Sequence, residues 1–244
     1  SLGIGDYAHT NLEPYSGYIQ DIRIYKGVAK YTSNFIPAST NPDILPDTPS
    51  GVSGSSKLAK NIGGAVNFDG NDYLEVAYNS DLNLSNSDFT IEFWMYPERV
   101  FDANDNGIIT FGENVGSSKE FIFAGYTGSS GTALRVMGSS DGSNANIFNY
   151  VDVGTATIGA WQHIAIVRNG SSFKVYKNGI QTYSTDISTT SFYAQTTRGA
   201  VIGEYFNSGS PTGNGFHGII SNVRYIKETA LYTSNFTPPS APLT

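Results

Sequence analysis

The chain of 244 residues has no cysteine, which excludes a disulfide-stapled scaffold, a thiol nucleophile and a thiolate metal site. Charged residues are also scarce, at 14% against the roughly 25% of an ordinary domain. Lys and Arg number 14 against 21 Asp and Glu, a net charge of -7. This shortage of positive charge argues against binding to nucleic acid or to an anionic membrane. No apolar run approaches the ~18 residues of a membrane span, so membrane insertion is not predicted.

The polar surface comes instead from uncharged residues: 28 Ser, 21 Thr and 21 Asn together make up 29% of the sequence. Thr, Tyr and Phe favour strands, whereas Gly, Asn and Ser favour turns. Aromatic residues contribute a further 13%, which is more than a disordered chain carries. The composition therefore predicts a folded β protein.

An internal repeat relates the two ends of the chain. Residues 17–37 read GYIQDIRIYKGVAKYTSNFIP and residues 218–238 read GIISNVRYIKETALYTSNFTP, with 11 of 21 positions identical. Upstream of these copies, Ile4–Tyr7 parallels Ile202–Tyr205. The simplest interpretation is that the chain begins near the end of one domain and then contains a complete one. A chance similarity between two hairpins is the alternative.

After residue 64, short apolar or alternating runs are separated by Gly, Asn, Asp and Ser, a pattern typical of strands. Asn169-Gly170 and Asn178-Gly179 are suitable pairs for tight turns. No segment sustains a helical period, so a β-sandwich or jelly roll is predicted. The predicted strands are Ala65–Phe68, Tyr73–Val76, Phe89–Tyr96, Gly107–Phe111, Phe121–Ala124, Ala133–Met137, Ile147–Val151, Trp161–Arg168, Phe173–Lys177, Ala200–Ile202 and Gly218–Ile226.

Four motifs in this region resemble the laminin-G-like, concanavalin A-like jelly roll. They are NFDGNDYLEV at Asn67–Val76, DFTIEFWMYP at Asp88–Pro97, the WQHIAIVRNG and FKVYKNG runs within Trp161–Gly179, and GIISNVRY at Gly218–Tyr225. The resemblance implies an all-β jelly-roll sandwich of two antiparallel sheets, a fold that hosts lectins, glucanases and structural modules alike. The YTSNFTPP run after the last motif is similar to the tandem modules of bacteriophage virion proteins, marine ones in particular.

The repeat and this resemblance divide the chain into three parts. Residues 1–40 are predicted to be the C-terminal strands of an incomplete preceding jelly-roll repeat. Residues 41–60 are interpreted as a linker leading into the next domain, because they are rich in Pro, Ser and Gly. Residues 61–244 are predicted to form the complete laminin-G-like jelly roll.

Catalytic chemistry is poorly supported by the sequence. Glu92 is the one acid on the predicted strand Phe89–Tyr96, and its same-face neighbours Thr90 and Trp94 are not acids. Glycoside hydrolysis needs two carboxyl groups facing one bond. His163 lies in the middle of another predicted strand, where a packing role is favoured over that of a base. The protein is therefore predicted not to be an enzyme, with a glycoside hydrolase as a distant third hypothesis.

Two places could hold a calcium ion, although no cofactor is required for the predicted fold. Asp102, Asn104 and Asn106 match the first positions of an EF-hand loop. The strand expected at Gly107–Phe111 would carry Glu113, the twelfth position, roughly 20 Å from the loop, too far to complete the shell of ligands. What remains is an acidic, Asn-rich turn that could hold a cation by itself. The resemblance suggests a second place, at Asp69 and Asp72. The alternative role for these two residues is to bond their own turn.

Glycan binding would use aromatic rings together with planar hydrogen-bonding side chains in loops. Such side chains are present in the predicted loops, although no sequence spacing distinguishes them from the other aromatic residues. The candidate ligand-binding residues are Tyr126, Tyr150, Tyr193, Tyr205, Phe206 and Asn207.

The first functional hypothesis is a non-catalytic glycan-binding or adhesion module of a virion or cell-surface protein. The alternative is a purely structural virion module: a spacer, decoration or fibre element. The predicted partners are a surface glycan, and other virion subunits or copies of the chain itself. The predicted location is the virion surface or the extracellular space. A cleft lined by aromatic and amide side chains would favour the first hypothesis, and a large contact with other chains the second.

Overall fold

The computed structural model describes residues 64–102, 106–112, 121–125, 131–142, 144–194, 198–207, 209–240 and 243. The predicted segments 1–40 and 41–60 lie outside these residues, so the three-part division of the chain remains a prediction. Within the described part of the chain, no helix is long and apolar enough to cross a bilayer.

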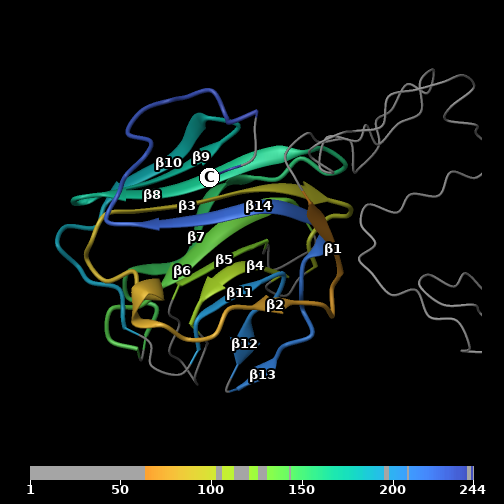
Figure 1. Cartoon of the computed structure of the whole chain (residues 1–244), viewed down its shortest axis with the longest axis horizontal. Coiled ribbons are helices and arrows are strands. Elements are labelled where there is room, and N and C mark those ends of the chain that lie inside the picture. The colour runs from red at the N-terminus through yellow and green to blue at the C-terminus, as the bar shows by residue number, and fades with distance from the viewer. Residues whose placement is uncertain are drawn as a thin grey trace, which may run out of the picture. The chain divides into compact units, whose positions relative to one another are not determined.

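Two six-stranded sheets form the sandwich (Figure 1), and every strand pair within them is antiparallel. The first sheet has the order β1-β14-β3-β8-β9-β10 and the second the order β2-β11-β4-β5-β6-β7, beside a β12-β13 hairpin. This arrangement confirms the predicted fold class. The elements are β1 Ala65–Asp69, β2 Leu74–Glu75, the 3-10 helix η2 Ser80–Leu82, β3 Phe89–Pro97, β4 Asn106–Phe111, β5 Phe121–Gly125, β6 Ala133–Gly138, β7 Phe148–Thr155, β8 Gln162–Asn169, β9 Ser172–Lys177, β10 Ile180–Asp186, β11 Ala200–Ile202, β12 Phe206–Asn207, β13 Ser210–Pro211 and β14 His217–Lys227.

Aromatic side chains fill the space between the two sheets. Phe93 of β3 meets Phe123 of β5 edge to face, with ring centroids 5.9 Å apart. Phe173 of β9 lies 6.3 Å from Phe121 of β5 and 4.6 Å from Phe148 of β7. Each such ring contributes about 1.5–3 kcal/mol through burial. The alternation along each strand places these rings inside because successive side chains point to opposite faces.

Strands β3 and β8 are interior strands and are buried on both of their faces. One face points into the sandwich. The other is covered by residues 228–238, which we call the C-terminal strap: Ala230, Tyr232 and Phe236 pack against a buried cluster of Ala165, Val167 and Tyr176. Because the strap covers this face, burial along β3 and β8 is nearly continuous instead of alternating between buried and exposed residues.

The two predicted tight turns differ in their outcome. Asn178 and Gly179 join β9 to β10 with φ of 50° and 77°. A two-residue type I′ turn needs positive φ at both positions, which an Asn-Gly pair adopts readily. The turn between β8 and β9 is formed by Gly170 and Ser171, one residue later than predicted, because Asn169 still pairs with Ser172. Gly170, with φ of 59°, takes the position that needs a glycine.

Three short or exposed strands were absent from the prediction: β10, β12 and β13. Strand β10 lies at the edge of the first sheet and is largely exposed. Because both of its faces carry Ser, Thr and Gln rather than a buried apolar series, the hydrophobic pattern gives no signal for it.

Candidate functional site

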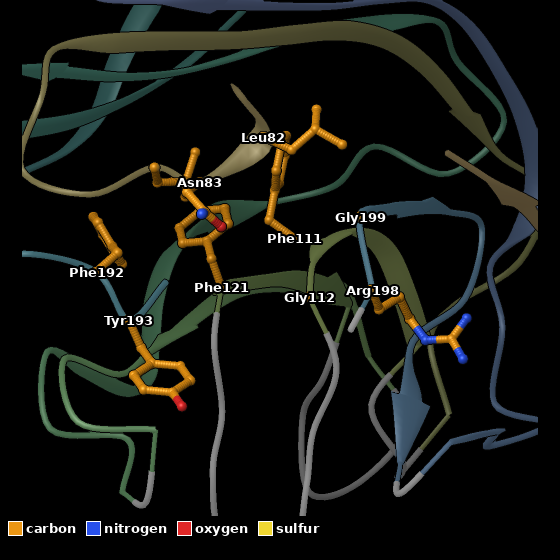
Figure 2. A pocket seen from close by; sticks show the side chains of 10 residues that line it. Leu82, Asn83, Phe111, Gly112, Phe121, Phe192, Tyr193, Arg198 and Gly199 are labelled. Carbon is orange, nitrogen blue, oxygen red and sulfur yellow. The ribbon is translucent and has the colours of Figure 1, made fainter. Parts of the chain in front are cut away.

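A pocket opens at one end of the sandwich, where η2, the ends of β4 and β5 and the chain before β11 come together (Figure 2). The pocket is small: its cavity volume is about 10 Å³, which is room for roughly one water molecule. Its lining combines apolar side chains with an amide, a phenol and a guanidinium. The lining residues are Leu82, Asn83, Leu84, Phe111, Gly112, Phe121, Phe192, Tyr193, Arg198 and Gly199.

Buried aromatic rings form the floor of this pocket. Phe111, Phe121 and Phe192 are at most 7% exposed. Phe121 and Phe192 meet edge to face at 5.6 Å, which fixes both rings. The floor is therefore continuous with the hydrophobic core.

Polar groups lie at the rim. Asn83 is one of the lining residues, and its amide is labelled in Figure 2. The guanidinium of Arg198 points away from the pocket, since it pairs with the Glu75 carboxylate and lies 3.7 Å from the centroid of the Phe206 ring. Arg198 therefore contributes its aliphatic stem to the pocket, while Asn83 offers the donor and acceptor that a ligand could use.

Tyr193 stands at the edge of the pocket with 44% of its surface exposed. Its ring lies over Gly142, where an added Cβ would come within 2.7 Å of the tyrosine Cζ. Gly142 also has φ of 70°, so a glycine is required there for two reasons. The backbone N–H of Tyr193 donates to the Ser139 carbonyl at 2.8 Å. The ring thus lies against the backbone of this loop while almost half of the residue's surface stays exposed.

The loop under this ring is polar and is held by its own hydrogen bonds. The Asp141 Oδ1 accepts from the Asn144 N–H at 2.9 Å and from the Ser139 hydroxyl at 3.1 Å. The Asn146 Oδ1 accepts from the Ser140 N–H at 2.8 Å. Sequence reasoning missed this loop and Asn83. The run of Ser, Asp, Gly and Asn at residues 139–144 was an available signal for the loop.

The structure describes the side chains of four predicted ligand-binding residues, and these four lie in more than one place, so the predicted set stays a prediction. Tyr193 adjoins the pocket, whereas Tyr205 is buried and packs with Ile122, Ala124 and Met137, beside the half-buried Tyr150. Phe206 is also buried and contacts the Tyr73 ring edge to face at 5.0 Å. Tyr126 and the side chain of Asn207 lie outside the described residues. Of the described members of this set, Tyr193 has the exposed ring that a glycan platform needs.

Three of the candidate calcium ligands, Asp69, Asp102 and Asn106, make local contacts. The Asp69 Oδ1 accepts from the Asn71 N–H at 3.0 Å, the turn-stabilising role expected as the alternative. Asp102 pairs with Arg99 at 2.8 Å, and its N–H donates to the Asn106 Oδ1 at 2.8 Å. Asn104 lies outside the described residues. Those residues contain no group of three or more His, Cys, Asp or Glu arranged to hold a metal, and calcium at Asp69, Asp72 or Asp102 remains a prediction.

Glu92 lies at the centre of a buried polar network on the strap side of the first sheet. Its carboxylate accepts from Arg224 Nε at 2.9 Å and from the Tyr232 hydroxyl at 2.9 Å, and Nε2 of His163 lies 3.0 Å from it. The Glu92 and His163 side chains are both fully buried. His163 also lies between Trp94 and Phe236, at 5.0 and 5.8 Å, which confirms the predicted packing role.

The network sets the protonation of its members. Burial raises the pKa of Glu92, but hydrogen bonds from His163, Arg224 and Tyr232 outweigh it and hold that pKa below its ordinary value of 4.5. Burial, together with the Glu92 charge, raises the pKa of Tyr232 to about 12. Glu92 is thus a stable carboxylate and Tyr232 a stable phenol at neutral pH.

Acid should therefore weaken the fold through Glu92. Because its pKa is lower in the folded than in the unfolded state, its contribution is fully present above about pH 4.5 and is lost as pH falls through the folded-state pKa. We expect the difference in unfolding free energy between the parent chain and a Glu92→Gln variant to shrink over this acid range. Urea titrations of both proteins at successive pH values measure it. A difference that stays constant down to pH 3 would contradict this assignment.

Comparison with known proteins places the chain in a family. Residues 68–231 match the family model described as the concanavalin A-like lectin/glucanases superfamily. The match covers more than half of the chain, which therefore belongs to this superfamily. No curated protein matches the chain.

Several solved structures share the fold. A candidate carbohydrate-binding protein from Bacteroides ovatus has 23% identity and a TM-score of 0.50, over 66% of this chain and 42% of that one. A heptameric SAP-like pentraxin from Limulus polyphemus has 19% identity and a TM-score of 0.49, over 69% and 77%. The CBM40 of the Ruminococcus gnavus IT-sialidase, bound to alpha2,3 sialyllactose, has 13% identity and a TM-score of 0.48, over 66% and 92%. The chain thus spans less than half of the length of the Bacteroides ovatus protein.

Proposed function

We propose that this protein is a non-catalytic glycan-binding module that uses the surface formed by Tyr193, Asn83 and the loop 139–146. The observation that carries the proposal is the exposed Tyr193 ring, which lies over Gly142 between a polar loop and a small pocket. Sugar rings have an apolar face that stacks on an aromatic ring and hydroxyl groups that need planar partners. Tyr193 offers the first kind of contact, and the Asn83 amide offers the second.

The comparisons support this class of function. The superfamily to which the chain belongs is named for lectins as well as glucanases. The Bacteroides ovatus protein with the same fold is described as a candidate for carbohydrate binding. Because the fold also hosts other activities, the proposal depends on the Tyr193 surface rather than on the fold alone.

The state of Glu92 supports a non-catalytic role. A glycoside hydrolase needs carboxyl groups that reach the substrate. The Glu92 side chain is fully buried and is held by Arg224, His163 and Tyr232 beneath the strap. A carboxylate in this position cannot approach a glycosidic bond while the strap is in place.

The setting that we propose is the surface of a virion or a cell, where a glycan-binding or adhesion module would meet its ligand. The resemblance of the YTSNFTPP run to bacteriophage virion modules favours a virion. The low content of basic residues suits an exposed location away from nucleic acid.

Replacing Tyr193 should weaken glycan binding without unfolding the protein. We expect Tyr193→Ala to lower affinity at least about tenfold, equivalent to about 1.4 kcal/mol, because a stacking platform is lost. A glycan array identifies the ligand, and calorimetry with the full chain measures the change.

The matched control is Tyr73→Ala, since Tyr73 is 40% exposed, against 44% for Tyr193, and does not line the pocket. It should leave affinity unchanged. Equal losses in the two variants, or binding that is unaffected by Tyr193→Ala, would contradict the proposed surface.

A further inference from the structure

Arg168, near the end of β8, carries a buried charge close to the pocket. The residue is 1% exposed, and its guanidinium carbon lies 6.0 Å from the centre of the Phe192 ring in the pocket floor. Burial lowers the pKa of the guanidinium from its ordinary value, and the nearby Asp88 charge acts against this effect. The group stays charged at neutral pH. Because a buried charge is costly unless its donors are satisfied, the guanidinium depends on its hydrogen bonds.

The guanidinium donates to backbone carbonyls from separate parts of the chain. Nη1 donates to the Ser85 carbonyl at 3.2 Å and to the Thr190 carbonyl at 2.7 Å. Nη2 donates to the Ser188 carbonyl at 3.3 Å, and Nε donates to the Gly170 carbonyl at 3.1 Å. One side chain therefore joins the segment before β3 to the segment after β10 and to the β8-β9 turn.

Two of these carbonyls belong to serines in an unfavourable backbone conformation. Ser85 has φ of 51° and Ser188 has φ of 50°. The left-handed region is uncommon for residues other than glycine, and such residues persist where the surrounding structure holds them. Both carbonyls accept from Arg168. The guanidinium thus stabilises the local conformation of both segments.

The same two segments carry the proposed glycan-binding surface. Asn83 lies two positions before Ser85, and Phe192 and Tyr193 follow shortly after the carbonyls that Arg168 contacts on the other segment. The Phe192 N–H donates to the Ser85 carbonyl at 3.0 Å, so the segments also meet directly. The Ser85 carbonyl therefore receives one bond from each side of this junction, and the buried guanidinium lies at its centre.

We propose that Arg168 is a positioning residue for glycan binding, which sets the placement of Asn83 relative to the Tyr193 ring. The inference rests on the proposed function, because it concerns the same surface. Arg168 acts through the two segments and does not touch the ligand, since it is almost fully buried. Lysine cannot replace it, because a single ammonium group lacks the planar fork of donors that reaches several carbonyls at once.

The test is Arg168→Lys in the full chain, which keeps the positive charge and removes the fork of donors. We expect affinity for the best glycan on an array to fall at least about tenfold, because several hydrogen bonds that place the surface are lost. Amide exchange at Phe192 should accelerate by at least a similar factor, because its N–H bonds to the Ser85 carbonyl. Calorimetry and hydrogen exchange measure the two effects.

Glu92→Gln is the matched control, because it also disturbs a fully buried charged group, but on the strap side of the first sheet. It should lower the melting temperature and leave glycan affinity unchanged. Equal losses of affinity in the two variants would show that Arg168 acts only through overall stability, and would overturn the proposal. A lysine variant with the affinity or the Phe192 exchange of the parent would overturn it too.

These outcomes differ from a failure of the proposed function, in which the parent chain binds no glycan and both proposals fall. If Arg168→Lys does not fold, NMR of the parent chain decides. The Nη–H protons of Arg168 should give separate, slowly exchanging signals, because the hydrogen bonds prevent rotation of the guanidinium. Their exchange should slow further when glycan binds. Averaged signals, or signals that the glycan leaves unchanged, would overturn the proposal.

Discussion

The Glu92→Gln variant is expected to lose about 3–5 kcal/mol of unfolding free energy, the cost of removing one partner from a buried ion pair. The substitution leaves the Arg224 guanidinium without its countercharge and weakens the bonds from His163 and Tyr232. For a domain of this size the loss corresponds to a fall in melting temperature of roughly 6–20 °C. Thermal and urea unfolding of the full chain measure it.

The control for this variant is Asp152→Asn. Asp152 pairs with Arg135 at 2.6 Å, but its side chain is 65% exposed. An exposed pair contributes about 0–1 kcal/mol, so the melting temperature should hardly change. If the two substitutions cost the same, Glu92 is not the buried centre that joins the strap to the sheet.

The Gly179→Ala variant should release the strap. Gly179 has φ of 77°, and an added Cβ would lie 1.8 Å from the Phe236 carbonyl oxygen. The left-handed conformation costs an alanine about 1–2 kcal/mol, and displacing the strap removes hydrogen bonds worth about 1 kcal/mol each. We therefore expect a total loss of about 3 kcal/mol, or roughly 6–12 °C in melting temperature. Amide exchange at Gln181 and Phe236 should accelerate as their bonds to the strap and the turn are lost.

Gly170→Ala is the matched control, because Gly170 also has positive φ in a hairpin of the same sheet, yet has nothing within 4 Å of an added Cβ. It should incur the conformational cost alone, about 1–2 kcal/mol, and leave exchange at Gln181 and Phe236 unchanged. Equal effects of the two alanines would show that the close approach of the strap to Gly179 has no energetic consequence.

The fold was largely predictable because its strands carry strong local signals. Phe89–Tyr96 and Trp161–Arg168 carry apolar residues on both faces and little charge, and both are interior strands. The sequence could not show what covers their outer faces. That depends on a long-range contact: Tyr232 meets Glu92 across 140 positions of sequence, and no local pattern encodes such a pairing.

The candidate site was less predictable for the same reason. Tyr193 and Tyr205 are both tyrosines in segments rich in small residues, yet the first is 44% exposed and the second 9%. The difference arises from packing partners: Gly142 supports one ring from below, while Ile122 and Met137 enclose the other. The repeat was the one long-range signal available in the sequence. It related residues 17–37 to residues 218–238 without showing that Arg224 and Tyr232 meet at Glu92.

Chemical-shift mapping tests the central claim most directly. The full chain, labelled with ¹⁵N, is titrated with the glycan that binds best on an array. Glycan binding through the proposed surface predicts shift changes at Asn83, at Tyr193 and in the loop 139–146, with none at Glu92 or His163 beneath the strap. Changes confined to the region around Tyr150 and Tyr205, or the absence of any change with every glycan tried, would contradict it.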